Sequence, residues 1–186
     1  YSQVQKAIER FSWDNEAGEY EVFVYGGKLA RILKDGRIDI LNRDNLGPIL
    51  DRTIDFIKID SQGITHRIYP PDKVILGVLN ANEWPGIPEL IGVSKIPIVR
   101  EDMSICTKPG YDPETKMYYL GEEMEIPTLS REEAIRTIGE IDDLIFSGFE
   151  FSDPASKGNA WFMLFQGMMR HLFRKVPYWY ITKPDV

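Results

Sequence analysis

The side chains that could carry chemistry are few and lie far apart in the chain. His66 and His171 are the only histidines, and neither has a cysteine or carboxylate at metal-ligand spacing. His66 belongs to a strand-like run and is interpreted as a surface residue. His171 lies near a helix C-terminus, where a contact with the helix dipole explains it. The sequence therefore predicts no metal site, no cofactor and no catalytic residue in this chain.

Other candidates for chemistry have simpler structural interpretations. The adjacent carboxylates at 122–123 and at 142–143 are interpreted as a charged turn and a solvated helix face, because neighbouring side chains generally point apart. Cys106 has no nearby histidine to activate it and is interpreted as a small core residue. The stretch 26–28, Gly-Gly-Lys, lacks the glycine spacing of a phosphate loop and lies between strand-like runs, which favours a hairpin.

Basic residues at the C-terminal end are mixed with aromatic ones, a combination that suits binding to single-stranded DNA. The candidates are Arg170, Arg174, Lys175 and Lys183. Arg170 and Arg174 also lie one helical turn apart near a helix C-terminus, where the macrodipole favours positive charge, and the aromatic residues could belong to a core strand. Both interpretations stay open at this point.

Apolar spacing and turn signals predict an α+β protein with an N-terminal antiparallel meander. We expect a meander-and-helix unit over 1–82, a proline-rich β-turn module over 83–128, and a helical part over 129–186. In the first part we expect helices at 4–11, from Asn42 or Asp44 to Arg52, and at 72–81, and strands at 21–25, 29–33, 38–41, 53–59 and 64–69. In the second part we expect short strands at 90–93, 96–99, 104–106 and 116–120, with 108–115 as a connecting turn.

Two helices are predicted in the last part. Ser130 and Glu133 form a capping-box pattern for a helix that ends near Ile145 and carries one apolar stripe, which we expect to be buried. The stripe comprises Ala134, Ile135, Ile138, Ile141, Leu144 and Ile145. A second helix begins at 152–154 and is apolar over most of its circumference, which indicates a core helix or, alternatively, an interface helix.

One turn in the proline-rich module supports a family comparison. Pro109, Gly110, Tyr111 and Asp112 are followed by Thr115, and Gly110 can supply a positive φ. Further matching positions are Pro88, Leu90, Gly92, Val93, Pro97 and Tyr118. This pattern resembles the region just upstream of the ATPase core in primase-helicase replication proteins of phages, plasmids and integrated elements. Residues 142–173 are similar to the family's pre-ATPase helix, although 149–151, Phe-Glu-Phe, replaces the family's proline-containing turn.

The resemblance implies a non-catalytic accessory or linker region of a mobile-element DNA replication helicase or primase. Such a region positions the motor on DNA or at a subunit interface, so the implied partners are single-stranded DNA, helicase subunits or a second copy. A strand at 178–181 and a GxxxxGK[ST] loop beyond Val186 are expected to follow, and we expect no ATP hydrolysis by this fragment alone. The alternative is a structural scaffold that makes only protein contacts.

Composition sets the remaining bounds. The 186 residues carry a net charge of −7, which argues against a surface that is basic throughout. Residues 81–150 hold six basic and fifteen acidic side chains, whereas 151–186 hold five and two. A single cysteine, no basic-then-apolar leader and no long apolar run predict a cytoplasmic protein outside the membrane.

Overall fold

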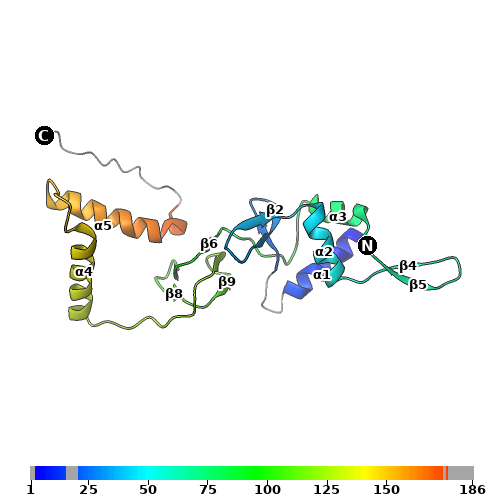
Figure 1. Cartoon of the computed structure of the whole chain (residues 1–186), viewed down its shortest axis with the longest axis horizontal. Coiled ribbons are helices and arrows are strands. Elements are labelled where there is room, and N and C mark those ends of the chain that lie inside the picture. Colours follow the sequence, from blue (N-terminus) through cyan, green and yellow to red (C-terminus); the bar gives the residue numbers. More distant parts are fainter. Residues whose placement is uncertain (1–2, 16–20, 174, 176–186) are drawn as a thin grey trace. The chain divides into compact units, whose positions relative to one another are not determined.

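The computed structural model describes residues 3–15, 21–173 and 175 (Figure 1). Within them, five α-helices accompany antiparallel strands in several small sheets, which confirms the α+β class. The chain divides into two compact units, which are described separately. Unit 1 comprises residues 1–97 and 108–122, and unit 2 comprises 98–107 and 123–186. The three-part organisation expected from the sequence, with boundaries at 82 and 128, stays a prediction.

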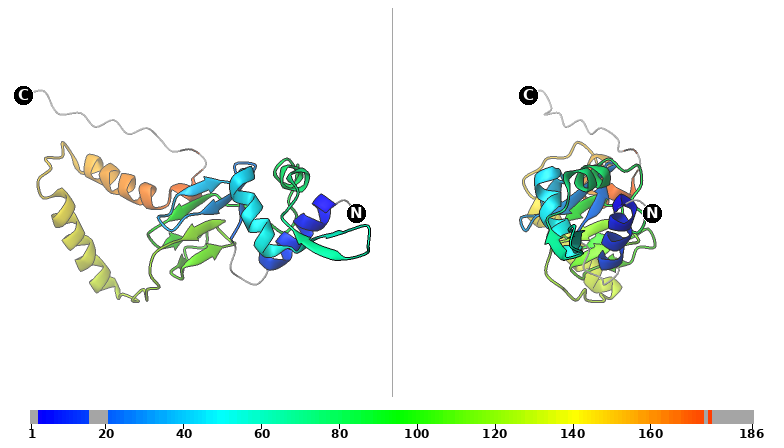
Figure 2. Two further views of the ribbon diagram at one scale, coloured as in Figure 1. Left: turned by 45° about the vertical axis from the view of Figure 1, so that its right-hand side comes forward. Right: turned by 90° about the vertical axis from the view of Figure 1, so that its right-hand side faces the viewer.

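Three helices of unit 1 lie close together in both views of Figure 2, and side chains of all three belong to one apolar core. They are α1 (Gln3–Asn15), α2 (Arg43–Thr53) and α3 (Asp72–Leu79). Helices α2 and α3 each bury residues at helical spacing: Leu46, Ile49 and Leu50 from α2, and Val74, Ile75 and Val78 from α3. This core is the largest apolar cluster in the described part of the chain and holds the adjoining strands in place.

The first sheet of unit 1 is an antiparallel meander of β1 (Phe23–Tyr25), β2 (Lys28–Ile32) and β3 (Ile38–Ile40). Gly26 and Gly27 join β1 to β2 with φ angles of 55° and 75°, which glycine adopts readily. The hairpin interpretation of this turn is confirmed, and the phosphate-loop alternative is wrong.

A separate hairpin pairs β4 (Phe56–Ile59) with β5 (Thr65–Ile68) and projects from unit 1 (Figure 1). Asp60 stabilises its tip, since Oδ1 accepts hydrogen bonds from the backbone N–H groups of Gln62 and Ile64. His66 is exposed, as predicted, and its Nε2 lies 2.9 Å from the second Asp60 oxygen.

The second sheet of unit 1 contains β6 (Gly92–Ser94), β10 (Met117–Tyr119) and β9 (Gly110–Asp112) in that spatial order. Strand β10 runs parallel to β6 and antiparallel to β9. The prediction that 108–115 is only a connecting turn is therefore wrong. Tyr111 pairs with Tyr118 across the sheet, and the connection is confined to the few residues between Asp112 and Met117.

Unit 2 contains a short hairpin and two separate α-helices. Strands β7 (Ile98–Val99) and β8 (Ile105–Cys106) pair antiparallel, and Cys106 is buried as expected. Helices α4 (Arg131–Phe146) and α5 (Pro154–Met168) follow, and a 3-10 helix, η1 (Arg170–Leu172), comes after α5. His171 contacts the hairpin, because its Nε2 lies 2.7 Å from the carbonyl oxygen of Val99.

The N-terminus of α2 offers a direct test of local sequence signals. The side-chain oxygen of Asn42 accepts from the N–H groups of Asp44 and Asn45, and Asn45 Oδ1 accepts from the N–H of Asn42. Asn42 is therefore the cap, and the Asp44 alternative is wrong. We expect Asn42→Ala to lower the free energy of unfolding of unit 1 by about 1 kcal/mol in urea titrations, because two helical N–H groups lose their acceptor.

Asn42→Ser is the matched control, because serine is also a good N-cap. It should retain most of the stability. Equal losses in Asn42→Ala and Asn42→Ser would contradict the capping explanation.

Candidate functional site

The motif at 109–112 has a structural role within unit 1. Gly110 has a φ of 122°, which confirms the expected positive φ. Asp112 is buried, and its Oδ2 accepts from Thr115 Oγ1 at 2.7 Å and from the Thr115 N–H at 3.2 Å. These bonds close the turn between β9 and β10, so the aspartate and the threonine of the motif are explained by an internal contact.

The tyrosine of the motif ties the same sheet to a neighbouring segment. Tyr111 donates from its hydroxyl to the carbonyl oxygen of Glu89 at 2.7 Å, and Lys116 Nζ lies 2.7 Å from Glu89 Oε2. The Phe23 ring packs on the rings of Tyr111 and Tyr118, with centroid distances of 5.4 and 5.9 Å. These contacts hold unit 1 together.

The basic residues predicted for nucleic-acid binding are only partly described. Arg170 and Lys175 are exposed, and Arg170 donates to the carbonyl oxygen of Phe173 at 2.7 Å. Arg174 and Lys183 lie outside the described residues, as does the strand expected at 178–181. DNA binding by these four residues therefore stays a prediction. In the described part of the chain, no group of three His, Cys, Asp or Glu side chains is placed to hold a metal ion.

Helices α4 and α5 are defined by strong local signals. Ser130 Oγ accepts from the Glu133 N–H, and Glu133 Oε2 accepts from the Ser130 N–H, which confirms the capping box. At α5, Asp153 Oδ1 accepts from the Ser156 N–H at 2.8 Å, and Pro154 occupies the first turn. Each helix therefore has a well-defined start that requires no support from a distant core.

One polar contact and one aromatic cluster connect the two helices. Asp142 on α4 binds Lys157 Nζ at 2.5 Å and accepts from Trp161 Nε1 at 3.0 Å. The Phe146 ring lies beside the Trp161 ring at a centroid distance of 5.6 Å. It also contacts the rings of Phe149 and Phe151 in the connection between the helices. The interpretation of 142–143 as a solvated helix face does not account for this role of Asp142, because its partner Lys157 lies fifteen residues further along the chain, on α5.

Several large apolar side chains of α4 and α5 are exposed, which corrects two predictions. Phe146 is the buried residue of α4, and the stripe members Ile135 and Ile138 are more than half exposed. On α5 the buried residue is Gln166, whereas Phe162, Phe165 and Met168 are about half exposed. The buried stripe and the core-helix interpretation are therefore wrong for the described structure. The helical periodicity of a sequence predicts that a helix has an apolar face, but it does not predict which residues cover that face.

The buried apolar side chains are divided unevenly between the two units, which explains this exposure. Nineteen apolar side chains of the described residues are buried, and only Ile98, Cys106 and Phe146 among them belong to unit 2. Unit 2 thus presents large apolar side chains without a core of matching size. In folded proteins, exposed apolar side chains that gather in number mark interaction sites.

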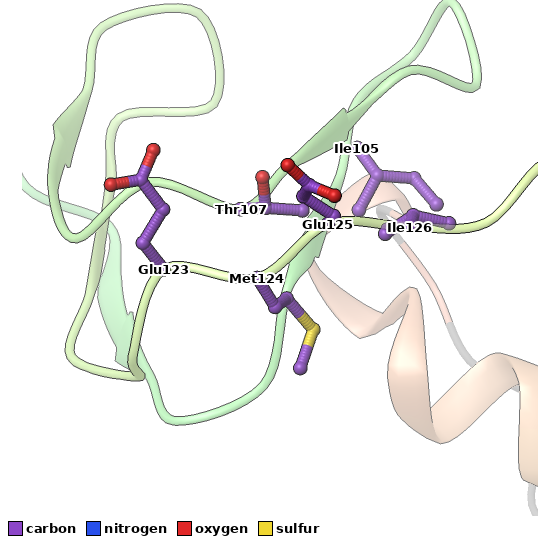
Figure 3. A pocket seen from close by; sticks show the side chains of 6 residues that line it. All are labelled: Ile105, Thr107, Glu123, Met124, Glu125 and Ile126. Carbon is purple, nitrogen blue, oxygen red and sulfur yellow. The ribbon is translucent and has the colours of Figure 1, made fainter.

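An open depression lies beside β8 in unit 2 (Figure 3). It has a volume of about 840 Å³ and is lined by Ile105, Thr107, Glu123, Met124, Glu125 and Ile126. Figure 3 shows the carboxylates of Glu123 and Glu125 on the opposite side of the chain from Met124, as expected for extended backbone. The mixed acidic and apolar lining gives the depression no set of groups suited to one reaction.

Comparisons with protein-family models, curated proteins and solved structures found no match. The resemblance to primase-helicase proteins therefore stays a prediction.

Among the described helices, none combines the length and the apolar character needed to cross a membrane. The feature that geometry singles out is the exposed apolar surface of α4 and α5.

The contact between α4 and α5 should depend on pH through Asp142. The hydrogen bond from Lys157, together with that from Trp161, lowers the pKa of the Asp142 carboxyl below its usual value. A lowered pKa in the folded state means that the contact is stabilised while Asp142 is charged and is lost as the pH falls through the lowered pKa. We therefore expect the Trp161 indole N–H resonance to move in NMR titrations only at pH values below the range in which an ordinary aspartate titrates.

Two comparisons separate this effect from acid unfolding. Asp142→Asn should remove the titration of the Trp161 resonance. The indole of Trp84 is an internal control, because its Nε1 donates to the uncharged carbonyl of Val78 in unit 1. A Trp161 titration that persists in Asp142→Asn, or that coincides with a change at Trp84, would contradict the proposed contact.

Proposed function

We propose that this chain is the non-catalytic region that precedes the motor domain in a mobile-element DNA replication helicase or primase, and that the motor docks on α5. The observation that carries the proposal is the exposure of Phe162, Phe165 and Met168 on a helix that is apolar around most of its circumference. The resemblance of residues 142–173 to the family's pre-ATPase helix covers the same helix and supports the same assignment.

The size of this surface suits a tethered partner. Complete burial of a large apolar side chain contributes about 1.5–3 kcal/mol, and these three are already half buried. Together they provide only a few kcal/mol, which the entropy cost of bringing two free proteins together would largely offset. A domain on the same polypeptide avoids most of that cost through its high effective concentration. The surface is therefore better matched to domain docking than to a tight complex between separate proteins.

Charge favours a protein partner over DNA at helix α4. Helix α4 carries two arginines and five carboxylates, so its surface repels phosphate. The second candidate function is single-stranded DNA binding, which the exposure of Arg170 and Lys175 just beyond α5 favours. A basic end beside a motor-docking helix would place a DNA strand near the motor.

Docking on α5 can be tested with the ATPase domain that the native gene is expected to encode beyond Val186, supplied as a separate protein. Phe162→Asp and Phe165→Asp should each weaken its binding by about tenfold or more in titration calorimetry, because each places a charge where apolar surface is buried. Ile57→Asp and Ile59→Asp on the β4–β5 hairpin are matched controls, since both isoleucines are exposed in unit 1. They should leave binding unchanged.

Two results would overturn the motor assignment. One is a native gene that stops or continues without a GxxxxGK[ST] pattern. The other is motor binding that is equally sensitive to the α5 and the hairpin variants.

The DNA-binding candidate predicts weak affinity for a fluorescent oligothymidine that decreases with added salt, because phosphate contacts release counterions. Arg170→Ala and Arg174→Ala should each reduce the anisotropy change and the salt dependence. Lys58→Ala, on the β4–β5 hairpin, is the control for loss of one exposed positive charge. Binding that is absent at low salt, or that ignores both arginine variants, would exclude this role.

A further inference from the structure

The depression beside β8 combines exposed apolar side chains with exposed carboxylates (Figure 3). Ile105, Met124 and Ile126 in its lining are each between 41 % and 47 % exposed. Glu123 and Glu125 are exposed as well, and neither carboxylate makes a hydrogen bond or an ion pair with another described residue. The depression is therefore suited to a segment that carries both positive charge and large apolar side chains.

The backbone along one side of the depression is also available for binding. Residues 123–126 belong to no described helix or strand, and their N–H and C=O groups make no hydrogen bond with a described residue. Extended backbone in this state is a template for strand addition, in which main-chain hydrogen bonds supply affinity and side-chain contacts supply specificity. These unpaired groups favour an extended peptide as the occupant.

The end of η1 lies next to the depression. His171 Nε2 is 2.7 Å from the carbonyl oxygen of Val99, and Val99 pairs directly with Ile105 in the β7–β8 hairpin. Paired strands are about 5 Å apart, and Ile105 lines the depression. All of these residues belong to unit 2. The chain that follows η1 therefore starts within a short distance of the depression.

The sequence after η1 matches the lining in charge and in apolar character. Residues 174–186 contain three basic side chains and one acidic one, and the run 178–181, Tyr-Trp-Tyr-Ile, is rich in strand-forming residues. Residues 176–186 lie outside the described residues, so this match is one of sequence. Five extended residues span about 17 Å, which allows the run to reach the depression from Phe173.

We propose that residues 178–181 bind in the depression of the same chain, as a strand added beside residues 123–126. The positive charges on either side of the run, Lys175 and Lys183, are then attracted to Glu123 and Glu125. The short connection gives the segment a high effective concentration, so a few contacts of ordinary strength are enough. This proposal goes beyond motor docking and DNA binding, because it uses a different surface and requires neither partner.

Hydrogen exchange of the full chain tests strand addition. The N–H groups of residues 123–126 that donate to the added strand should exchange about tenfold or more slowly than those of Thr128 and Leu129, which are equally exposed in the same connection. Trp179→Pro should abolish this protection, because proline cannot pair within a strand. Val186→Pro, outside the run, is the matched control and should leave the protection unchanged. Equally fast exchange at both places, or protection that survives Trp179→Pro, would overturn the proposal.

A spin label decides which chain supplies the strand. A nitroxide is attached to Thr182→Cys in a Cys106→Ala background, and the methyl signals of the apolar lining residues are followed by NMR. Docking within one chain predicts that these signals broaden in a fully labelled sample. The broadening should disappear when spin-labelled chains without isotopes are mixed with isotope-labelled chains without the spin label. Broadening that persists in this mixture would show docking on a second copy and would overturn the proposal.

The charge contribution is tested in the same spin-labelled chain. Glu123→Gln and Glu125→Gln together should reduce the broadening about threefold at low salt, because the attraction between exposed charges is lost. Glu83→Gln, which removes an exposed carboxylate of unit 1, should have no effect. Broadening that ignores the paired glutamine substitutions would contradict recognition by the acidic lining. None of these measurements needs DNA or a motor, so each proposed function can fail without this proposal.

Discussion

The backbone pairing between Val24 and residues 88–90 is the contact on which unit 1 depends. The Val24 N–H donates to the carbonyl oxygen of Pro88, and the Leu90 N–H donates to the carbonyl oxygen of Val24, both at 2.8 Å. Proline fits this position because it needs to supply only an acceptor. These two bonds connect the meander, which packs with the helical core, to the sheet that contains the 109–112 motif. Tyr111 and Lys116 reinforce the joint through Glu89.

Unit 2 is organised by a different principle. Its helices begin at strong caps and meet through Asp142, Phe146 and their partners on α5, but few of its apolar side chains are buried. In proteins, most helical stability comes from packing of an apolar face. Helices that are locally well specified and poorly covered are therefore suited to packing against something outside their own unit. Unit 1 therefore has its own apolar core, whereas the packing of unit 2 is incomplete.

The sequence predicted local structure better than it predicted burial. The caps at Asn42 and Ser130 and the hairpin at 26–27 rest on hydrogen bonds and φ angles within a few residues, so they could be recognised from the sequence alone. The strand at 110–112 was missed because its pairing with 117–119 competes with the turn chemistry of Gly110 and Asp112. The link from Asp142 to Lys157 was missed because it depends on how two helices meet. The pairing of the two helices leaves no local signature in the sequence.

The apolar side chains of α4 and α5 nevertheless differ in their arrangement. Helix α5 is apolar around most of its circumference, and such a surface fits a broad, concave site on a folded domain. Helix α4 has exposed apolar side chains on one side, among them Ile135, Ile138 and Leu144, and most of its five carboxylates lie elsewhere on the helix. Asp142 and Phe146 hold the two helices in contact through Trp161 on α5. Through this contact, a partner that binds one of the two helices would also affect the position of the other.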